Sequence, residues 1–179
     1  MKKEWKPTTA VVPCPVVLLS VAGEDRPNII TLSWVANVCS NPPTIIAGIR
    51  TQRHSYEMVK NTGEFVLNIP SINQIDAAEF AGTKSGRDFD KFKECNLTAV
   101  PASKVNSPMI EECPINIECK IIKVESAGVH DVFTAEVVAV HIDESVLDEN
   151  GRFVASEAQL FTYLPLNGEY WSLGKRLQA

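Results

Sequence analysis

Short runs of apolar and β-branched residues, separated by polar turns, make up most of the chain. Such runs are typical of β-strands, because branched side chains pack well on a pleated surface. The run Thr44–Ile49 contains so few polar residues that it should be buried on both faces of a sheet. The runs that predict strands are Val16–Val21, Asn28–Val38, Thr44–Ile49, Phe65–Ile69, Ile115–Val124 and Phe133–Ile142.

Only two segments have helical spacing. A helix is predicted over Tyr56–Thr62, with Gly63 as its C-terminal stop, and a second from about Asn73 to Ala81, with Gly82 as its stop. Many strands and few helices predict a mostly β fold, an antiparallel barrel of about six to eight strands. The region before Pro15 is expected to pack on this body through its tryptophan.

Length and composition indicate one packed domain over residues 1–179, with 45% hydrophobic and 22% charged residues. A net charge of −5 argues against a nucleic-acid partner, which would require a basic face. No apolar run approaches the roughly 20 residues of a membrane-spanning helix, and no signal-peptide core is visible. Five widely spaced cysteines without a CxxC pair predict a reduced, cytoplasmic protein without a metal site.

A basic loop rich in hydroxyl groups, Arg50–Ser55, precedes the first predicted helix. Its arginines offer forked donors to an anion, and the N–H groups at the helix start would complete the cradle. The alternative is that Thr51 or Ser55 caps the helix while the arginines remain solvated. The residues by themselves leave both possibilities open.

Two other kinds of site find no support in the sequence. The chain has neither a GxGxxG motif nor a phosphate loop, which argues against a dedicated Rossmann dinucleotide site. Its paired carboxylates, Glu111–Glu112 and Asp143–Glu144, are adjacent in sequence, and neighbouring strand residues face opposite ways. They do not form the spaced acid pair of a glycosidase.

Six sequence motifs occur in a fixed order from Pro15 to Lys175: PVVLLSV, PNIITLSW, NPPTIIAGI, RHSYEMVKNTGEFVLNIP, DKF and EYWSLGK. In their order and spacing they resemble the flavin reductase-like family of FMN-binding split barrels, which includes flavoredoxins and archaeal flavin and ferric reductases. The resemblance implies an antiparallel split β-barrel with a few peripheral helices. It also implies bound FMN and a homodimer in which both subunits complete each flavin pocket.

The resemblance further implies where the cofactor lies. Relatives hold the FMN phosphate at the helix start, lay the isoalloxazine and ribityl chain along the segment 31–37, and bring the loop 83–90 close to the flavin. A lysine near the pyrimidine carbonyl would stabilise negative charge on reduced flavin. The cofactor-binding residues implied in this way are Thr31, Leu32, Ser33, Trp34, Asn37, Arg50, Arg53, His54, Ser55, Thr83 and Lys84.

His130 is the candidate catalytic residue. The family often has Gly-Asp-His between its two long strands, near the face where substrate or nicotinamide approaches, whereas this chain reads Gly-Val-His-Asp over 128–131. The alternative is a solvated histidine in a turn.

The resemblance thus predicts an FMN-binding oxidoreductase that uses NAD(P)H to reduce flavin or another small acceptor, such as a ferric complex. Two alternatives stay open. One is a flavoredoxin-like electron carrier that exchanges electrons with a redox protein and has no NAD(P)H activity. The other is a barrel that binds a ligand without redox chemistry.

Overall fold

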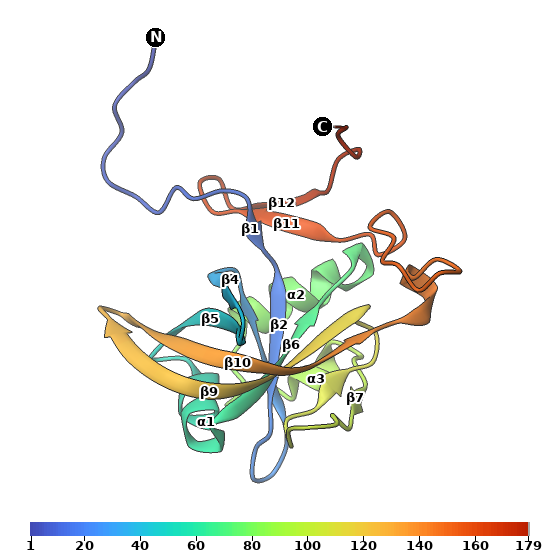
Figure 1. Ribbon diagram of the computed structural model, residues 1–179. Helices are drawn as coiled ribbons and strands as arrows, with labels where there is room; N and C mark the ends of the chain where they lie inside the picture. The colour runs from blue at the N-terminus through green and yellow to red at the C-terminus, as the bar shows by residue number, and fades with distance from the viewer. Residues whose placement is uncertain (179) are drawn as a thin grey trace.

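A seven-stranded antiparallel sheet forms the body of the protein in the computed structural model, which describes residues 1–178 (Figure 1). Its strand order is β3-β2-β6-β9-β10-β5-β4. The prediction of a mostly β, antiparallel split barrel is therefore confirmed. The strands are β2 (Val17–Val21), β3 (Asn28–Leu32), β4 (Val35–Ser40), β5 (Pro43–Arg50), β6 (Glu64–Ile69), β9 (Ile115–Ala127) and β10 (His130–Ile142).

The predicted strand over 28–38 is in fact two strands, β3 and β4, which lie at opposite edges of the sheet. Residues so close in sequence can occupy both edges only if the sheet curls until its edges approach each other. The bend at Ser33 and Trp34 carries the chain across this gap. Apolar periodicity continues through the bend, which explains why the sequence pattern did not reveal it.

The helix α1 (His54–Thr62) packs one face against the core of the curled sheet. Its apolar side chains, Tyr56 and Val59, belong to the main hydrophobic core together with Phe65 and Phe133. The helix ends at Gly63, whose φ of 69° lies in the left-handed region that glycine adopts readily. The predicted helix and its stop are confirmed, and the helix begins two residues earlier than predicted.

A second core lies on the other side of β2 and β3, under α2 (Ile75–Thr83) and α3 (Lys91–Glu94). Gly82 was predicted to end α2, but it lies inside the helix, which continues to Thr83. The remaining short elements are β1 (Cys14–Pro15), η1 (Ile72–Gln74), β7 (Ala99–Val100), β8 (Met109–Ile110), η2 (Glu144–Val146), β11 (Phe161–Leu164) and β12 (Glu169–Ser172).

Strands β1, β11 and β12 form a small sheet beside the barrel, and the first residues of the chain project beyond it (Figure 1). The expectation that this N-terminal arm packs on the body is wrong, because Trp5 is 66% exposed and the arm joins no strand before Cys14. No helix within residues 1–178 has the length and apolar character needed to cross a membrane.

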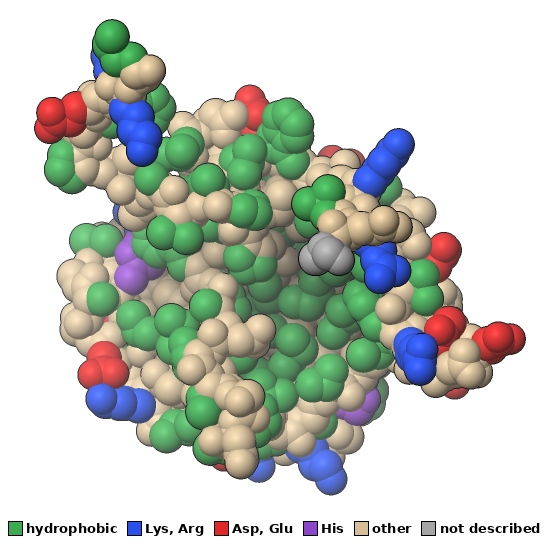
Figure 2. Space-filling model, turned by 45° about the horizontal axis from the view of Figure 1, so that its top comes forward, with side chains coloured by type: hydrophobic (Ala, Val, Ile, Leu, Met, Phe, Trp, Pro, Cys, Tyr) green, Lys and Arg blue, Asp and Glu red, His purple; other side chains and the backbone are tan. Residues whose placement is uncertain are grey.

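Figure 2 shows hydrophobic side chains gathered around a hollow on the face near both termini. The large apolar side chains that remain exposed in the single chain include two further tryptophans and residues of β4 and the C-terminal segment. These are Trp34, Val38, Leu166, Trp171 and Leu173. A patch of this kind marks an interaction surface more often than a solvated one.

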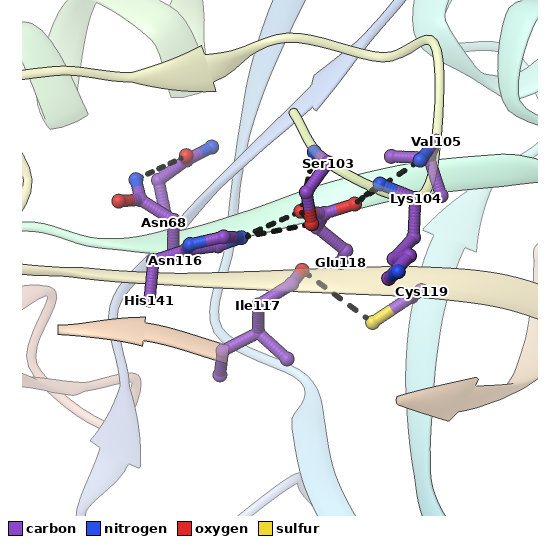
Figure 3. Close-up of polar contacts among 9 residues, drawn as sticks. All are labelled: Asn68, Ser103, Lys104, Val105, Asn116, Ile117, Glu118, Cys119 and His141. Atoms are coloured by element: carbon purple, nitrogen blue, oxygen red, sulfur yellow. Dashed lines mark hydrogen bonds and ion pairs between the residues drawn. The ribbon is translucent and has the colours of Figure 1, made fainter. Parts of the chain in front are cut away.

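A fully buried carboxylate holds the long segment between α3 and β9 against the barrel (Figure 3). Glu118 accepts hydrogen bonds from the backbone N–H groups of residues 103, 104 and 105, and from the Ser103 hydroxyl. Its Oε1 also lies 2.6 Å from Nε2 of His141. Burial by itself would raise the pKa of Glu118, but hydrogen bonds from Ser103, His141 and Lys104 outweigh burial and lower that pKa to about 2.

Replacing Glu118 by Gln should destabilise the fold by about 2–4 kcal/mol, because the three backbone donors lose a charged acceptor. The carboxylate is ionised to lower pH in the folded protein than in the unfolded chain. Its stabilising contribution is therefore complete above its ordinary pKa of 4.5 and is lost as the pH falls toward about 2. Urea unfolding of both proteins between pH 7 and pH 3 measures this difference.

Glu125→Gln is the matched control, since Glu125 is exposed and, within the described part of the chain, forms an ion pair with Lys123 alone. It should change stability by less than about 1 kcal/mol at every pH. A Glu118→Gln variant as stable as this control would contradict the assigned role of the buried carboxylate.

Candidate functional site

A cleft of about 300 Å³ opens where the start of α1 meets the end of α2 and the loop 84–90. It gathers five of the residues that the resemblance implied for cofactor binding: Arg50, Arg53, His54, Ser55 and Lys84. Gln52, Gly86, Arg87 and Lys91 also line it, although none of them was among the individually predicted cofactor-binding residues.

The first turn of α1 has no side-chain cap. Arg53 occupies the N-cap position with an extended backbone and accepts no hydrogen bond through its side chain. Ser55 does not cap either, because its hydroxyl lies inside the first turn and accepts a hydrogen bond from Asn28. The alternative in which Ser55 merely caps the helix is thus excluded. The N–H groups of this turn can receive an anion.

Positive charge is concentrated around this uncapped helix start, although the protein as a whole carries a net charge of −5. Among residues 1–178, no aspartate or glutamate lines the cleft. Burial, and then the charges of Arg87, Lys91 and Arg26, lower the pKa of His54. A charge set of this kind repels itself in the absence of an anion and attracts a phosphate group strongly.

Lys91 is the most unusual residue of the cleft. Only 4% of it is exposed, and its Nζ donates hydrogen bonds to the carbonyl oxygens of Ile29, at 2.9 Å, and Ala81, at 2.7 Å. Burial, and then the charge of Arg53, lower its pKa from 10.5 to about 8. The only sequence signal for Lys91 was its place in the DKF motif. Burial of a lysine depends on packing that no local pattern records.

Three of the predicted cofactor residues have structural contacts outside the cleft. Thr31 donates its hydroxyl hydrogen to the Ala78 carbonyl at 2.6 Å, and Leu32 belongs to the main core. Thr83 was expected in a loop, but it is the last residue of α2 and bonds back to the carbonyl of Glu79. Of these side chains, Thr31 links β3 to α2, Leu32 packs in the core, and Thr83 bonds only within its own helix.

His130 was expected in a turn, but it is the first residue of β10 and pairs with Arg50 across the sheet. The connection expected over residues 125–131 is much shorter, because both strands extend into it, and consists of Gly128, whose φ is 81°, and Val129. The His130 ring lies 4.5 Å from the ring of Trp34. Burial, and then the charge of Arg50, lower the pKa of His130.

The segment after β3 therefore lies beside this aromatic pair and not in the cleft. Ser33 is at the bend, and Asn37 is exposed on the edge strand β4. Arg50 belongs to both regions, since it lines the cleft and pairs with His130. The cleft and the aromatic pair of Trp34 and His130 are therefore connected through Arg50.

Asp131 has a clear structural contact. Its carboxylate accepts a hydrogen bond from the Tyr56 hydroxyl at 2.6 Å, and the Tyr56 ring packs edge-on against Phe133. The acid that follows His130 thus connects the hairpin of β9 and β10 to α1, and so helps to fix the start of the helix.

The structure thus defines an antiparallel split-barrel protein with a basic cleft, a candidate anion site, at the start of α1. The family model described as "Flavin reductase like domain" matches residues 9–166, and the chain therefore belongs to this family. The resemblance inferred from its motifs is confirmed.

Individual relatives agree with this assignment. A protein of Archaeoglobus fulgidus is 35% identical over 150 residues, which cover 80% of this chain and 85% of the relative. The flavoredoxin of Desulfovibrio vulgaris (Miyazaki F) superposes with a TM-score of 0.93 and 32% identity, covering 100% and 97% of the two chains. The FMN reductase (NADH) RutF of Agrobacterium fabrum is 23% identical, covering 66% and 68%.

Replacing Lys91 by Met should change how the stability of the flavin-free protein depends on pH. A lysine with a lowered pKa in the folded state binds fewer protons there than in the unfolded chain, so the folded state gains stability as the pH rises from about 8 to 10.5. Wild type should gain about 2–4 kcal/mol relative to Lys91→Met over this interval. Urea unfolding at pH 7.5 and pH 10 measures the gain.

Lys84→Met controls for the loss of one positive charge from the cleft, since Lys84 is exposed. If wild type and Lys91→Met differed by the same free energy at both pH values, the charge of Lys91 would not be desolvated in the folded protein.

Proposed function

We propose that the protein is an FMN-binding oxidoreductase that uses NAD(P)H to reduce flavin or another small acceptor through bound FMN. The observation that carries this proposal is the uncapped start of α1, surrounded by basic side chains in a cleft with no acidic residue. This donor set fits a phosphate dianion, and family membership makes the phosphate of FMN the candidate.

In this proposal the chain binds and orients the cofactor. Arg53, Ser55 and the first N–H groups of α1 would hold the phosphate, while Arg50 lies between that end and the aromatic pair of Trp34 and His130. When bound there, FMN would supply the redox chemistry, which is hydride and electron transfer. Lys91 keeps a positive charge in the cleft without exposure to bulk water, and such a charge favours an anionic ligand.

The relatives support two variants of this function. The name of the RutF relative supports NADH as the electron donor. The likeness to a flavoredoxin supports the second variant, an electron carrier that receives electrons from a redox protein without direct NAD(P)H activity.

We also propose that the protein works in the cytoplasm. All five cysteines are free, which supports a reducing compartment.

An anaerobic absorbance experiment separates these possibilities. FMN is added to the purified protein, and spectra are recorded before and after NADPH, then NADH, then dithionite. We expect a bound-flavin spectrum that bleaches with one of the nucleotides. Free FMN at the same concentration serves as the control for non-enzymatic reduction.

If the bound flavin resisted both nucleotides but was reduced by dithionite, the reductase proposal would be wrong and the electron-carrier function would take its place. A protein that takes up no FMN would contradict both variants and leave a barrel that binds another ligand.

We also propose that the protein acts as a homodimer in which the second copy covers β4 and completes the flavin pocket. Residues Ala36 to Ser40 of this edge strand are exposed, with Val38 at 52%. An uncovered apolar edge strand promotes uncontrolled pairing with other chains, and proteins normally protect it. Trp34 directly precedes β4 and lies beside His130, so a partner that covered β4 would lie close to the proposed position of the flavin ring.

Replacing Val38 by Asp should shift the protein from dimer to monomer and weaken FMN binding by about tenfold, because a charge would be buried in the interface. Light scattering after gel filtration measures the mass, and fluorescence titration measures the affinity. Ile72→Asp, a similar change of an exposed apolar residue on η1, is the control. A Val38→Asp protein that remained dimeric would place the interface elsewhere.

A further inference from the structure

We infer that Asn28 is a positioning residue that aims the Ser55 hydroxyl group at the anion bound at the start of α1. This inference rests on the proposed function. Asn28 is the first residue of β3 and is only 4% exposed. Its Nδ2 donates a hydrogen bond to Oγ of Ser55 at 2.8 Å. Ser55 lines the cleft, whereas Asn28 is not among the residues that line it.

The direction of this hydrogen bond determines what Ser55 can do. A hydroxyl group has one hydrogen to donate and two lone pairs to accept with. Because Asn28 supplies a donor, Ser55 uses a lone pair toward β3 and keeps its hydrogen. Within residues 1–178 the Ser55 hydroxyl donates to no other group. The hydrogen is therefore available to a phosphate oxygen in the cleft.

The loop above α2 holds Asn28 in this position. Gly86 packs directly on the Asn28 side chain, and a Cβ atom at residue 86 would overlap Oδ1 of Asn28 and lie 2.8 Å from Cδ2 of His54. Arg26 fixes the loop by donating from Nη2 to the Gly86 carbonyl at 3.1 Å. Any side chain at residue 86 would displace Asn28 from Ser55. The glycine is thus required by the close approach of the loop to β3.

A purely structural role for Asn28 predicts a different pattern of ligand affinities. If the amide only supported the packing of β3 against α1, its loss would affect every flavin equally. If it acts through Ser55, its loss affects only ligands that carry the phosphate. Riboflavin has the same ring and ribityl chain as FMN but no phosphate, so it distinguishes the two roles.

The test is a double-mutant cycle with two ligands. Dissociation constants for FMN and riboflavin are measured by fluorescence titration for wild type, Asn28→Ala, Ser55→Ala and the double variant. Ser107→Ala is the matched control, because its buried hydroxyl also accepts a hydrogen bond, from the Ala22 N–H, but lies outside the cleft. Gly86→Ala is a further variant that retains both Asn28 and Ser55.

We expect Ser55→Ala to weaken FMN binding by about tenfold or more, the usual effect of a lost hydrogen bond to a charged group. Asn28→Ala and Gly86→Ala should each weaken FMN binding by about fivefold. Riboflavin binding should change by less than about twofold in all three. The double variant should bind FMN no more weakly than Ser55→Ala, because Asn28 has no effect once the hydroxyl is gone.

Additive losses in the double variant, or equal losses for FMN and riboflavin, would overturn the inference and leave Asn28 a packing residue. Tighter FMN binding by Asn28→Ala would also overturn it, since the amide would then hold the hydroxyl hydrogen away from the phosphate. These results differ from failure of the proposed function, in which wild type itself binds no FMN. If Asn28→Ala did not fold, Asn28→Leu, which has a similar size but no hydrogen-bond donor, would replace it in the cycle.

Discussion

The pairing of the β9–β10 hairpin between β6 and β5 is the constraint on which the rest of the molecule depends. β5 leads into α1 and β6 leads out of it, yet the two strands are separated in the sheet by the whole hairpin. Pairing of β10 with β5 and of β9 with β6 therefore fixes both ends of α1. The hydrogen bond from Tyr56 to Asp131 adds a direct link from hairpin to helix. The position of the basic helix start follows from these long-range pairings.

The cleft departs from the rules that stabilise the rest of the fold. Elsewhere polar groups are paired; Glu118, for example, has a full set of donors. At the start of α1 the helix lacks a side-chain cap, and a buried lysine lies among other cations. Such departures cost stability and are expected at functional sites, where a ligand compensates for them. The free N–H groups of the uncapped helix and the surrounding cations explain why the cleft suits an anion.

Much of the fold was predictable because its signals are local. The apolar runs, the glycine that ends α1 and the two long strands are patterns within single segments, and the structure confirms them. The errors occurred where tertiary structure overrides a local pattern. The run over 28–38 divides because the barrel closes there, and α2 continues through Gly82 because packing on β3 outweighs the weak helix propensity of glycine.

For the site, the sequence alone determined the residue types and their order: arginines, a histidine and a serine delivered to a helix start, in the motifs of a flavin reductase-like chain. Only the tertiary structure decided which side chains share the cleft. Lys91 reaches a carbonyl 62 residues away in sequence, and Asn28 reaches a hydroxyl 27 residues away. Burial, hydrogen-bond direction and shifted pKa values arise from such contacts between distant segments. No local pattern encodes them, because each segment contributes only half of the interaction.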